Sequence, residues 1–118
     1  MEQIWKDMLT EHDKKCLANQ SSFQPRRGLG SKPALIVIDM QKDFVDQALG
    51  TPEAQAIVPN VVAKINEYKA RGDVIIATKD THEESYLETQ EGVNLPFIHC
   101  VQNTEGWQLD DAVQAAMP

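Results

Sequence analysis

Hydrophobic positions in this chain fall into short runs separated by polar and turn-forming residues. The run over residues 34–38 is continuously apolar, which is typical of a parallel strand buried on both faces. Shorter runs predict a second strand over 74–78 and a third over 97–101, the third limited at its start by Pro96. A short helical turn is expected over 83–88. The pattern therefore indicates an α/β domain with a parallel sheet.

The segment between the first two strands has the periodicity of a helix. Pro59 suits the first helical position, where a missing N–H group costs nothing, so residues 39–58 are expected to form a loop. Gly72 suits the C-terminal cap of this helix. Its predicted apolar face consists of Val61, Val62, Ile65 and Tyr68. Residues 34–78 thus form a predicted βαβ unit with a right-handed crossover.

Residues 2–18 predict an amphipathic helix, and the Ser-, Gly- and Pro-rich residues 21–33 predict a connector after it. This helix is expected to pack against the domain or against a neighbouring subunit. Another helix is expected over 108–117. The predicted organisation is an N-terminal helix and linker extension over 1–31, followed by a partial α/β domain over 32–118.

Charge and composition exclude several classes of protein. The net charge is −7 and the chain has only two adjacent basic pairs, so a nucleic-acid partner is not expected. No apolar stretch is long enough for a membrane span, and a membrane partner is not expected either. Two cysteines do not make a disulfide framework, which favours a reducing, cytoplasmic location.

Candidate metal ligands stand where the predicted strands end, at the edge where open α/β sheets build their sites. Asp80 and His82 lie two residues apart in extended chain, so their side chains point to the same side. A carboxylate and an imidazole suit zinc, iron or manganese. His99 would complete three protein ligands and leave a position for water, as in catalytic sites. The alternative is that Asp80 caps a turn and His82 is a surface histidine.

Asp39 ends the first predicted strand, where a buried carboxylate is costly unless it is paired or functional. It could act as a general base or as a charge partner for a nucleophile. A capping or turn role, suggested by the nearby Asp43 and Asp46, is the alternative. Phosphoryl transfer by Asp39 would call for a second carboxylate two residues later, where Gln41 stands. Phe44 either lines the pocket or begins the core after the loop.

Cys100 adjoins His99, which invites a nucleophilic role. Neighbouring residues on a strand point to opposite faces, so a His99 in the site would place Cys100 in the packing. Buried free cysteine usually behaves as a small hydrophobic residue. A structural role is therefore predicted for Cys100, and also for Cys16 on the N-terminal helix.

Three motifs carry a family resemblance that runs from about Lys32 to about Leu109. They are Ala34-Leu-Ile-Val-Ile-Asp39-Met-Gln41-x-Asp43-Phe44, Thr78-x-Asp80-x-His82 and Leu95-Pro-x-x-His99-Cys100-x-x-x-Thr104-x-Gly106. In this order they resemble the isochorismatase-like cysteine hydrolases, and among these the nicotinamidase branch. The resemblance implies a Rossmann-like, three-layer α/β/α fold with a parallel sheet, of which about three strands would be present here.

The resemblance also implies hydrolysis of a small amide such as nicotinamide to an acid and ammonia, through thiolate attack on the amide carbon. Asp39 would be the acid/base member of an Asp-Lys-Cys triad. Asp80, His82 and His99 would hold a divalent metal ion, with zinc expected first and iron or manganese as alternatives. This ion would orient the pyridine nitrogen of the substrate, and Phe44 would lie against the substrate ring.

The lysine and the nucleophilic cysteine of that triad have no recognisable counterpart in this sequence. The chain alone is therefore expected to be inactive, and its alternative function is that of a non-catalytic metal-binding or oligomerisation subunit. The strand over 34–38 would have an unprotected apolar edge, which promotes association. A homo-oligomer or a complementing chain is accordingly expected.

Overall fold

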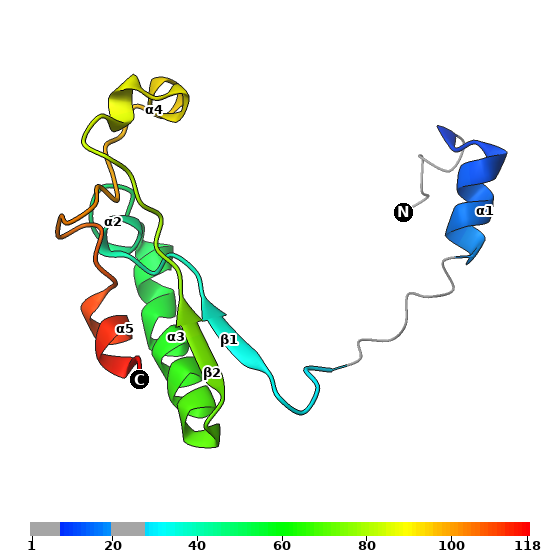
Figure 1. Ribbon diagram of the computed structural model, residues 1–118, viewed down its shortest axis with the longest axis horizontal. Helices are drawn as coiled ribbons and strands as arrows, with labels where there is room; N and C mark the ends of the chain where they lie inside the picture. The colour runs from blue at the N-terminus through cyan, green and yellow to red at the C-terminus, as the bar shows by residue number, and fades with distance from the viewer. Residues whose placement is uncertain (1–7, 20–27) are drawn as a thin grey trace. The chain divides into compact units, whose positions relative to one another are not determined.

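The computed structural model describes residues 8–19 and 28–118 (Figure 1). The chain divides into two units, residues 1–31 and 32–118, and each is considered by itself. In the first unit, α1 spans Glu11–Asn19. Thr10 precedes it, and its hydroxyl accepts a hydrogen bond from the Asp13 backbone N–H at 3.2 Å. The helix predicted over 2–18 is thus present from Glu11 onward, and residues 1–7 lie outside the described residues.

The second unit is built on the predicted βαβ arrangement. Strand β1 (Ala34–Val37) pairs in parallel with β2 (Val74–Ala77), and Ala34 stands opposite Val74. Helix α3 (Pro52–Arg71) connects the two strands and lies along the sheet in Figure 1, with α5 (Asp111–Ala116) beside it. The βαβ prediction is therefore confirmed.

The core lies on one face of this sheet. Alternate residues of the strands, such as Leu35 and Val37, face α3 because side chains alternate along a strand. The buried cluster consists of Val37, Met40, Val45, Ile65, Val113 and Ala116. On the other face, Ile36 is 55% exposed and Ile76 47% exposed. The expectation that the first strand is buried on both faces is wrong for the described residues, since helices cover only one face.

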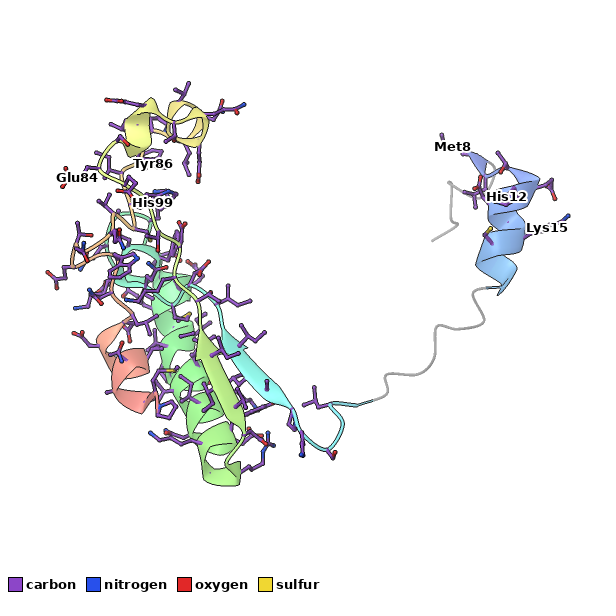
Figure 2. All side chains as sticks on the ribbon, viewed as in Figure 1. Met8, His12, Lys15, Glu84, Tyr86 and His99 are labelled. Atoms are coloured by element: carbon purple, nitrogen blue, oxygen red, sulfur yellow. The ribbon has the colours of Figure 1, made fainter. Side chains whose placement is uncertain are left out.

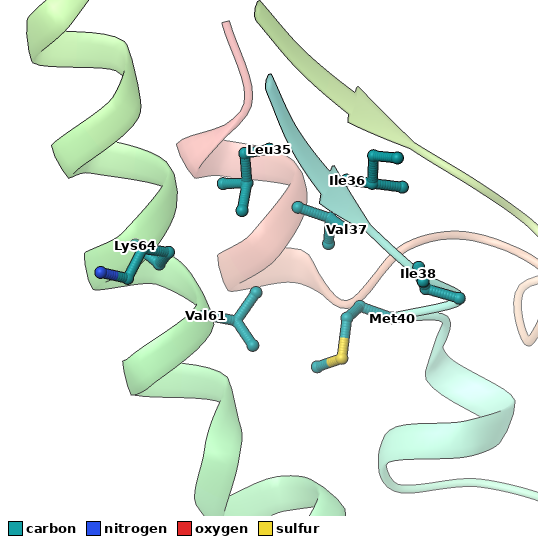
Figure 3. A pocket seen from close by; sticks show the side chains of 7 residues that line it. All are labelled: Leu35, Ile36, Val37, Ile38, Met40, Val61 and Lys64. Atoms are coloured by element: carbon teal, nitrogen blue, oxygen red, sulfur yellow. The ribbon is translucent and has the colours of Figure 1, made fainter. Parts of the chain in front are cut away.

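An apolar groove runs beside β1 on its unpaired side. It has a volume of about 170 Å³, and the side chains of Figure 3 surround it. Its lining residues are Leu35, Ile36, Val37, Ile38, Met40, Val61 and Lys64. Because β2 pairs with only one edge of β1, the other edge faces this groove and no described strand covers it.

The third strand predicted over 97–101 is wrong. This segment makes a single parallel bridge, between His82 and Val101, and the sheet within the described residues has two strands. The backbone of Cys100 has a φ of +48°, in the left-handed region, which interrupts an extended chain. The apolar composition of the segment therefore does not produce a ladder.

The start of α3 also differs from the prediction. Thr51 is the N-cap, with its side chain accepting a hydrogen bond from Ala54 N, and Pro52 occupies the first turn. Pro59 lies inside the helix, so its predicted role as the first helical residue is wrong. At the other end, Gly72 caps the helix with a φ of +73°, as predicted. Within residues 39–58, α2 (Lys42–Val45) forms an additional short helix.

Three short helices complete the unit. The 3-10 helix η2 (Tyr86–Glu88) lies within the turn predicted over 83–88, whereas α4 (Gln90–Asn94) was not predicted. Helix α5 begins after its N-cap, Asp110, and is shorter than the helix predicted over 108–117. No helix in residues 8–19 and 28–118 has both the length and the apolar character that crossing a membrane requires.

Pro59 gives a test of the helix boundary. Because proline cannot donate to the carbonyl of Gln55, Pro59→Ala should raise the free energy of unfolding by about 1–3 kcal/mol. Pro52→Ala, at a position where the N–H is unpaired in any case, should change it by less than about 0.5 kcal/mol. Urea unfolding monitored by circular dichroism measures both. Equal effects at the two prolines would contradict an α3 that begins at Pro52.

Candidate metal centre

Asp80, His82 and His99 come together in one group. The Oδ2 atom of Asp80 lies 3.0 Å from Nε2 of His82 and 3.4 Å from Nε2 of His99. One ligand atom from each residue lies within 4.8 Å of the other two. The side chains of His99 and His82 are only 3% and 13% exposed, so neither is a surface histidine.

Two segments of backbone carry these side chains. Asp80 and His82 follow the carboxyl end of β2 in extended chain, and their side chains meet as the two-residue spacing predicts. The segment of His99 lies alongside, because His82 N donates to Cys100 O at 2.9 Å and Gln102 N donates to His82 O at 2.9 Å. The bridge between these segments therefore brings the third side chain to the first two.

The orientation of His99 is set by its other ring nitrogen. Nδ1 of His99 lies 2.6 Å from the carbonyl oxygen of Phe97. A carbonyl can only accept a hydrogen bond, so Nδ1 is the donor in this contact, and Nε2, which lies on the side of Asp80, is the nitrogen that a metal ion would use. Such a bond to the distal nitrogen is typical of metal-binding histidines.

Aromatic rings enclose the group. Tyr86 is 1% exposed, and its ring centroid lies 4.5 Å from that of His82 and 5.1 Å from that of His99. Tyr86 and His99 are both labelled in Figure 2. Its hydroxyl donates to Leu95 O at 2.8 Å. Burial raises the pKa of Tyr86, and Glu91 and Asp80 raise it further, so the hydroxyl stays protonated. The ring of Phe44 lies 5.6 Å from His99 on another side.

Asp39 lies at the carboxyl end of β1, outside the group of three candidate ligands. Its backbone has a φ of +51°, and its Oδ1 accepts a hydrogen bond from the Thr78 hydroxyl at 2.7 Å. The same hydroxyl accepts from the Asp39 N–H at 3.2 Å. The N-cap of α2 is Gln41, so Asp39 does not cap that helix. The carboxylate is instead held against the neighbouring strand end.

The donor set of the group fits a divalent metal ion. One carboxylate oxygen and two imidazole nitrogens are ligands that transition ions accept, and three protein ligands leave coordination positions open. A polar cavity of about 320 Å³ adjoins His82 and is also lined by Glu84 and Gln102. A small molecule therefore has space beside the His82 side chain.

Several residues of this region have contacts that their places in the sequence motifs did not predict. Gln41 is fully buried with its amide bonded to backbone, Asp43 is 8% exposed, and Thr78 pairs with Asp39. The available indication was the alternation of polar residues at Asp39, Gln41 and Asp43 beside an apolar run. Nothing in the spacing pointed to Tyr86.

Comparison with known proteins supports the resemblance seen in the motifs. The chain is 35% identical over 92 residues to a nicotinamidase of Escherichia coli (strain K12), covering 64% of this chain and 43% of that relative. The solved structure of pyrazinamidase of Pyrococcus horikoshii in complex with zinc is 44% identical in sequence and superposes with a TM-score of 0.57. The comparison covers 64% of this chain and 43% of that chain. For nicotinamidase/pyrazinamidase from Bacillus subtilis the identity is 29% and the TM-score 0.61, with 71% and 47% covered.

The chain spans less than half the length of these relatives. These structures confirm the predicted α/β fold with a parallel sheet. The described residues of this chain contain two strands of that sheet. Residues 33–117 match the isochorismatase domain. From its motifs, its fold and this match, the chain belongs to the isochorismatase family.

Proposed function

We propose that this chain is the metal-binding part of a nicotinamidase-like amidohydrolase, which converts a small amide such as nicotinamide to an acid and ammonia. The observation that carries the proposal is the convergence of Asp80, His82 and His99 within a family member. Relatives that are named nicotinamidase, and one that was solved with zinc, support it. In this proposal residues 32–118 form the partial domain and residues 1–31 an extension.

The proposed roles follow the geometry. Asp80, His82 and His99 would hold a divalent ion, zinc by preference, with iron or manganese as alternatives. Such an ion supplies a Lewis acid that orients a small substrate. Phe44 offers an aromatic face beside His99 for the substrate ring. Asp39 is the proposed acid/base, and its bond to the Thr78 hydroxyl fixes its carboxylate for that role.

The described residues supply no activated thiol. Cys100 is fully buried, and burial, followed by Asp80, Asp43 and Asp39, raises its pKa to about 12. A nucleophilic cysteine needs a lowered pKa, so Cys100 is a packing residue. Nζ of Lys79 lies 3.8 Å from the ring centroid of Trp107 and donates to Oε1 of Gln108 at 3.0 Å.

The edge of β1 is the proposed site of association. Ile36 and Ile38 are 55% and 66% exposed beside the apolar groove of Figure 3, and an unpaired apolar strand edge readily accepts another strand. We propose that a second copy or a complementing chain adds a strand there. An added strand would also cover the exposed sheet face in part.

A non-catalytic metal-binding or oligomerisation subunit of the same fold is the second candidate. The observation that favours it is the complete burial of Cys100, which keeps this thiol away from any substrate. Metal binding and association would then be the whole function, and ammonia release is the measurement that separates the two.

The location is proposed to be cytoplasmic. Cys16 and Cys100 are both free thiols, one exposed and one buried. Free thiols persist where the surroundings are reducing, which is the ordinary condition of the cytoplasm.

Zinc binding and turnover test the proposed function. His82→Ala should weaken zinc affinity by more than the roughly 10- to 100-fold typical of changes around the ligands, since it removes a ligand itself. In the assembled, zinc-loaded protein, Asp39→Ala should lower ammonia release from nicotinamide by about 100- to 10,000-fold and leave zinc affinity unchanged. Activity that survives Asp39→Ala would contradict the hydrolase. Absence of turnover in zinc-loaded protein that is assembled with its complementing chain would favour the second candidate.

Thiol labelling tests the state of Cys100. At pH 8 a thiol reagent should label Cys16 within seconds to minutes and leave Cys100 unmodified, because Cys16 is exposed to the reagent, whereas Cys100 is buried and its pKa is raised to about 12. Because the pKa of Cys100 is raised on folding, ionisation in the unfolded chain should lower stability as the pH rises above about 9. Labelling of both thiols at equal rates in the native protein would contradict this assignment.

Light scattering tests the edge of β1. The parent chain should form oligomers, and Ile38→Lys should weaken their association at least about tenfold, because a charge beside an edge strand opposes pairing. Val93→Lys, at a position 71% exposed on α4, is the matched control and should change little. A stable, monodisperse parent monomer would contradict the proposed association.

A further inference from the structure

The side chain of Gln41 is fully buried and joined to the backbone of Asp80. Its Oε1 accepts a hydrogen bond from Asp80 N at 2.7 Å, and its Nε2 donates to Asp80 O at 2.8 Å. A second donated bond, at 2.9 Å, goes to Trp107 O. The amide thus pairs with Asp80 as a neighbouring peptide group would, and both of its N–H donors are used.

The backbone of Gln41 is fixed from the opposite side. It forms an antiparallel bridge with Leu109, and Lys42 N donates to Gln108 O at 2.9 Å. Asp110 N donates to Met40 O at 2.8 Å. Because its backbone is anchored in this way, the side chain of Gln41 determines how far the Asp80 backbone stands from it.

Asp43 makes the corresponding contact with the second ligand-bearing segment. Its Oδ2 accepts a hydrogen bond from Cys100 N at 2.7 Å, directly after His99. Its own N–H donates to Gly106 O at 3.0 Å. Cys100 has a left-handed backbone, and the Asp43 carboxylate stabilises the turn that it forms.

We propose that Gln41 and Asp43 are positioning residues that together set the separation between the Asp80 segment and the His99 segment. They stand two residues apart at the start of α2, where Gln41 is the N-cap and Asp43 lies in the first turn. Gln41 holds the backbone that carries one ligand, and Asp43 holds the backbone that carries another. Metal affinity depends on ligand placement to within a few tenths of an ångström, so these contacts decide whether three separate side chains act as one site.

This inference rests on the proposed metal centre and extends it to residues that contact no metal. A purely structural role is the competing explanation, since Gln41 also satisfies buried backbone groups whose loss would lower stability. The two explanations differ in what a variant loses. A structural residue affects the unfolding free energy alone, whereas a positioning residue also affects metal affinity and the ligand field of the bound ion.

Variants of Gln41 separate these explanations. In Gln41→Glu the Nε2 donor is replaced by an oxygen that faces two carbonyl oxygens, those of Asp80 and Trp107. Gln41→Met keeps the length of the side chain without any hydrogen bond. The matched control is Val113→Ala, a fully buried core position in α5, which should lower stability without touching the ligand segments.

Asp43 offers a conservative rescue. Asp43→Asn keeps an oxygen acceptor for Cys100 N and should hold zinc affinity within about threefold of the parent, whereas Asp43→Ala should lower it about tenfold or more. A requirement for negative charge at this position would make the two variants equally weak. That result would contradict positioning by the hydrogen bond.

The measurements are zinc affinity by competition with a chromophoric chelator, the visible absorption spectrum of the cobalt(II) form, and amide hydrogen exchange at Asp80 in the metal-free protein. Both Gln41 variants should lose about 10- to 100-fold in zinc affinity and shift the cobalt spectrum. Gln41→Met should speed exchange at the Asp80 amide. Val113→Ala should lose about as much stability as the Gln41 variants, yet its zinc affinity, cobalt spectrum and Asp80 amide exchange should stay close to the parent values.

Two outcomes would overturn the inference, and they are distinguishable. If the parent binds zinc and the Gln41 variants bind it equally well, the positioning role is contradicted but the metal centre is not. The same conclusion follows if the Val113→Ala control loses as much zinc affinity as the Gln41 variants. A parent that binds no zinc would contradict the metal centre itself, and the positioning role with it.

Discussion

The parallel pairing of β1 with β2 is the interaction on which the rest of the structure depends. Its register brings Val37 level with Ala77, so both strands end at the same edge of the sheet. Asp39 can therefore meet Thr78, and the chain beyond each strand continues side by side. Burial of one sheet face against α3 and α5 fixes this pairing. Strand register thus places Asp80 and His82 of the candidate metal centre, whereas His99 comes from a separate segment that is bridged to His82 and is not a strand.

The sequence predicted much of the βαβ unit and the meeting of Asp80 with His82, because both follow from local spacing. Gly72 at the end of α3 and the two-residue separation of Asp80 and His82 are features of this kind. Pro59 was misleading because proline also occurs within a helix when the start is secured by another cap, here Thr51. The contacts of Gln41 could not be inferred, since they join residues far apart in the chain.

The segment around His99 illustrates the limit of hydrophobic pattern. Its apolar residues favour a strand, yet the backbone of Cys100 is left-handed. The N–H of Cys100 donates a hydrogen bond to the Asp43 carboxylate. A side chain distant in sequence thus overrides local preference. Burial, followed by Asp80, this carboxylate and Asp39, raises the pKa of the Cys100 thiol. The thiol of Cys100 is accordingly part of the packing around the candidate metal centre.

Gly106 has a consequence for how this sequence can change over time. A Cβ atom at this position would collide with the Asp43 carboxylate, while Gly106 O accepts the Asp43 N–H. Substitution at either position therefore alters what the other can tolerate, and the effects of the two should be strongly non-additive. The two positions are therefore expected to change in a fixed order during evolution. A residue larger than glycine at position 106 is tolerated only after Asp43 has been replaced by a residue with a smaller side chain.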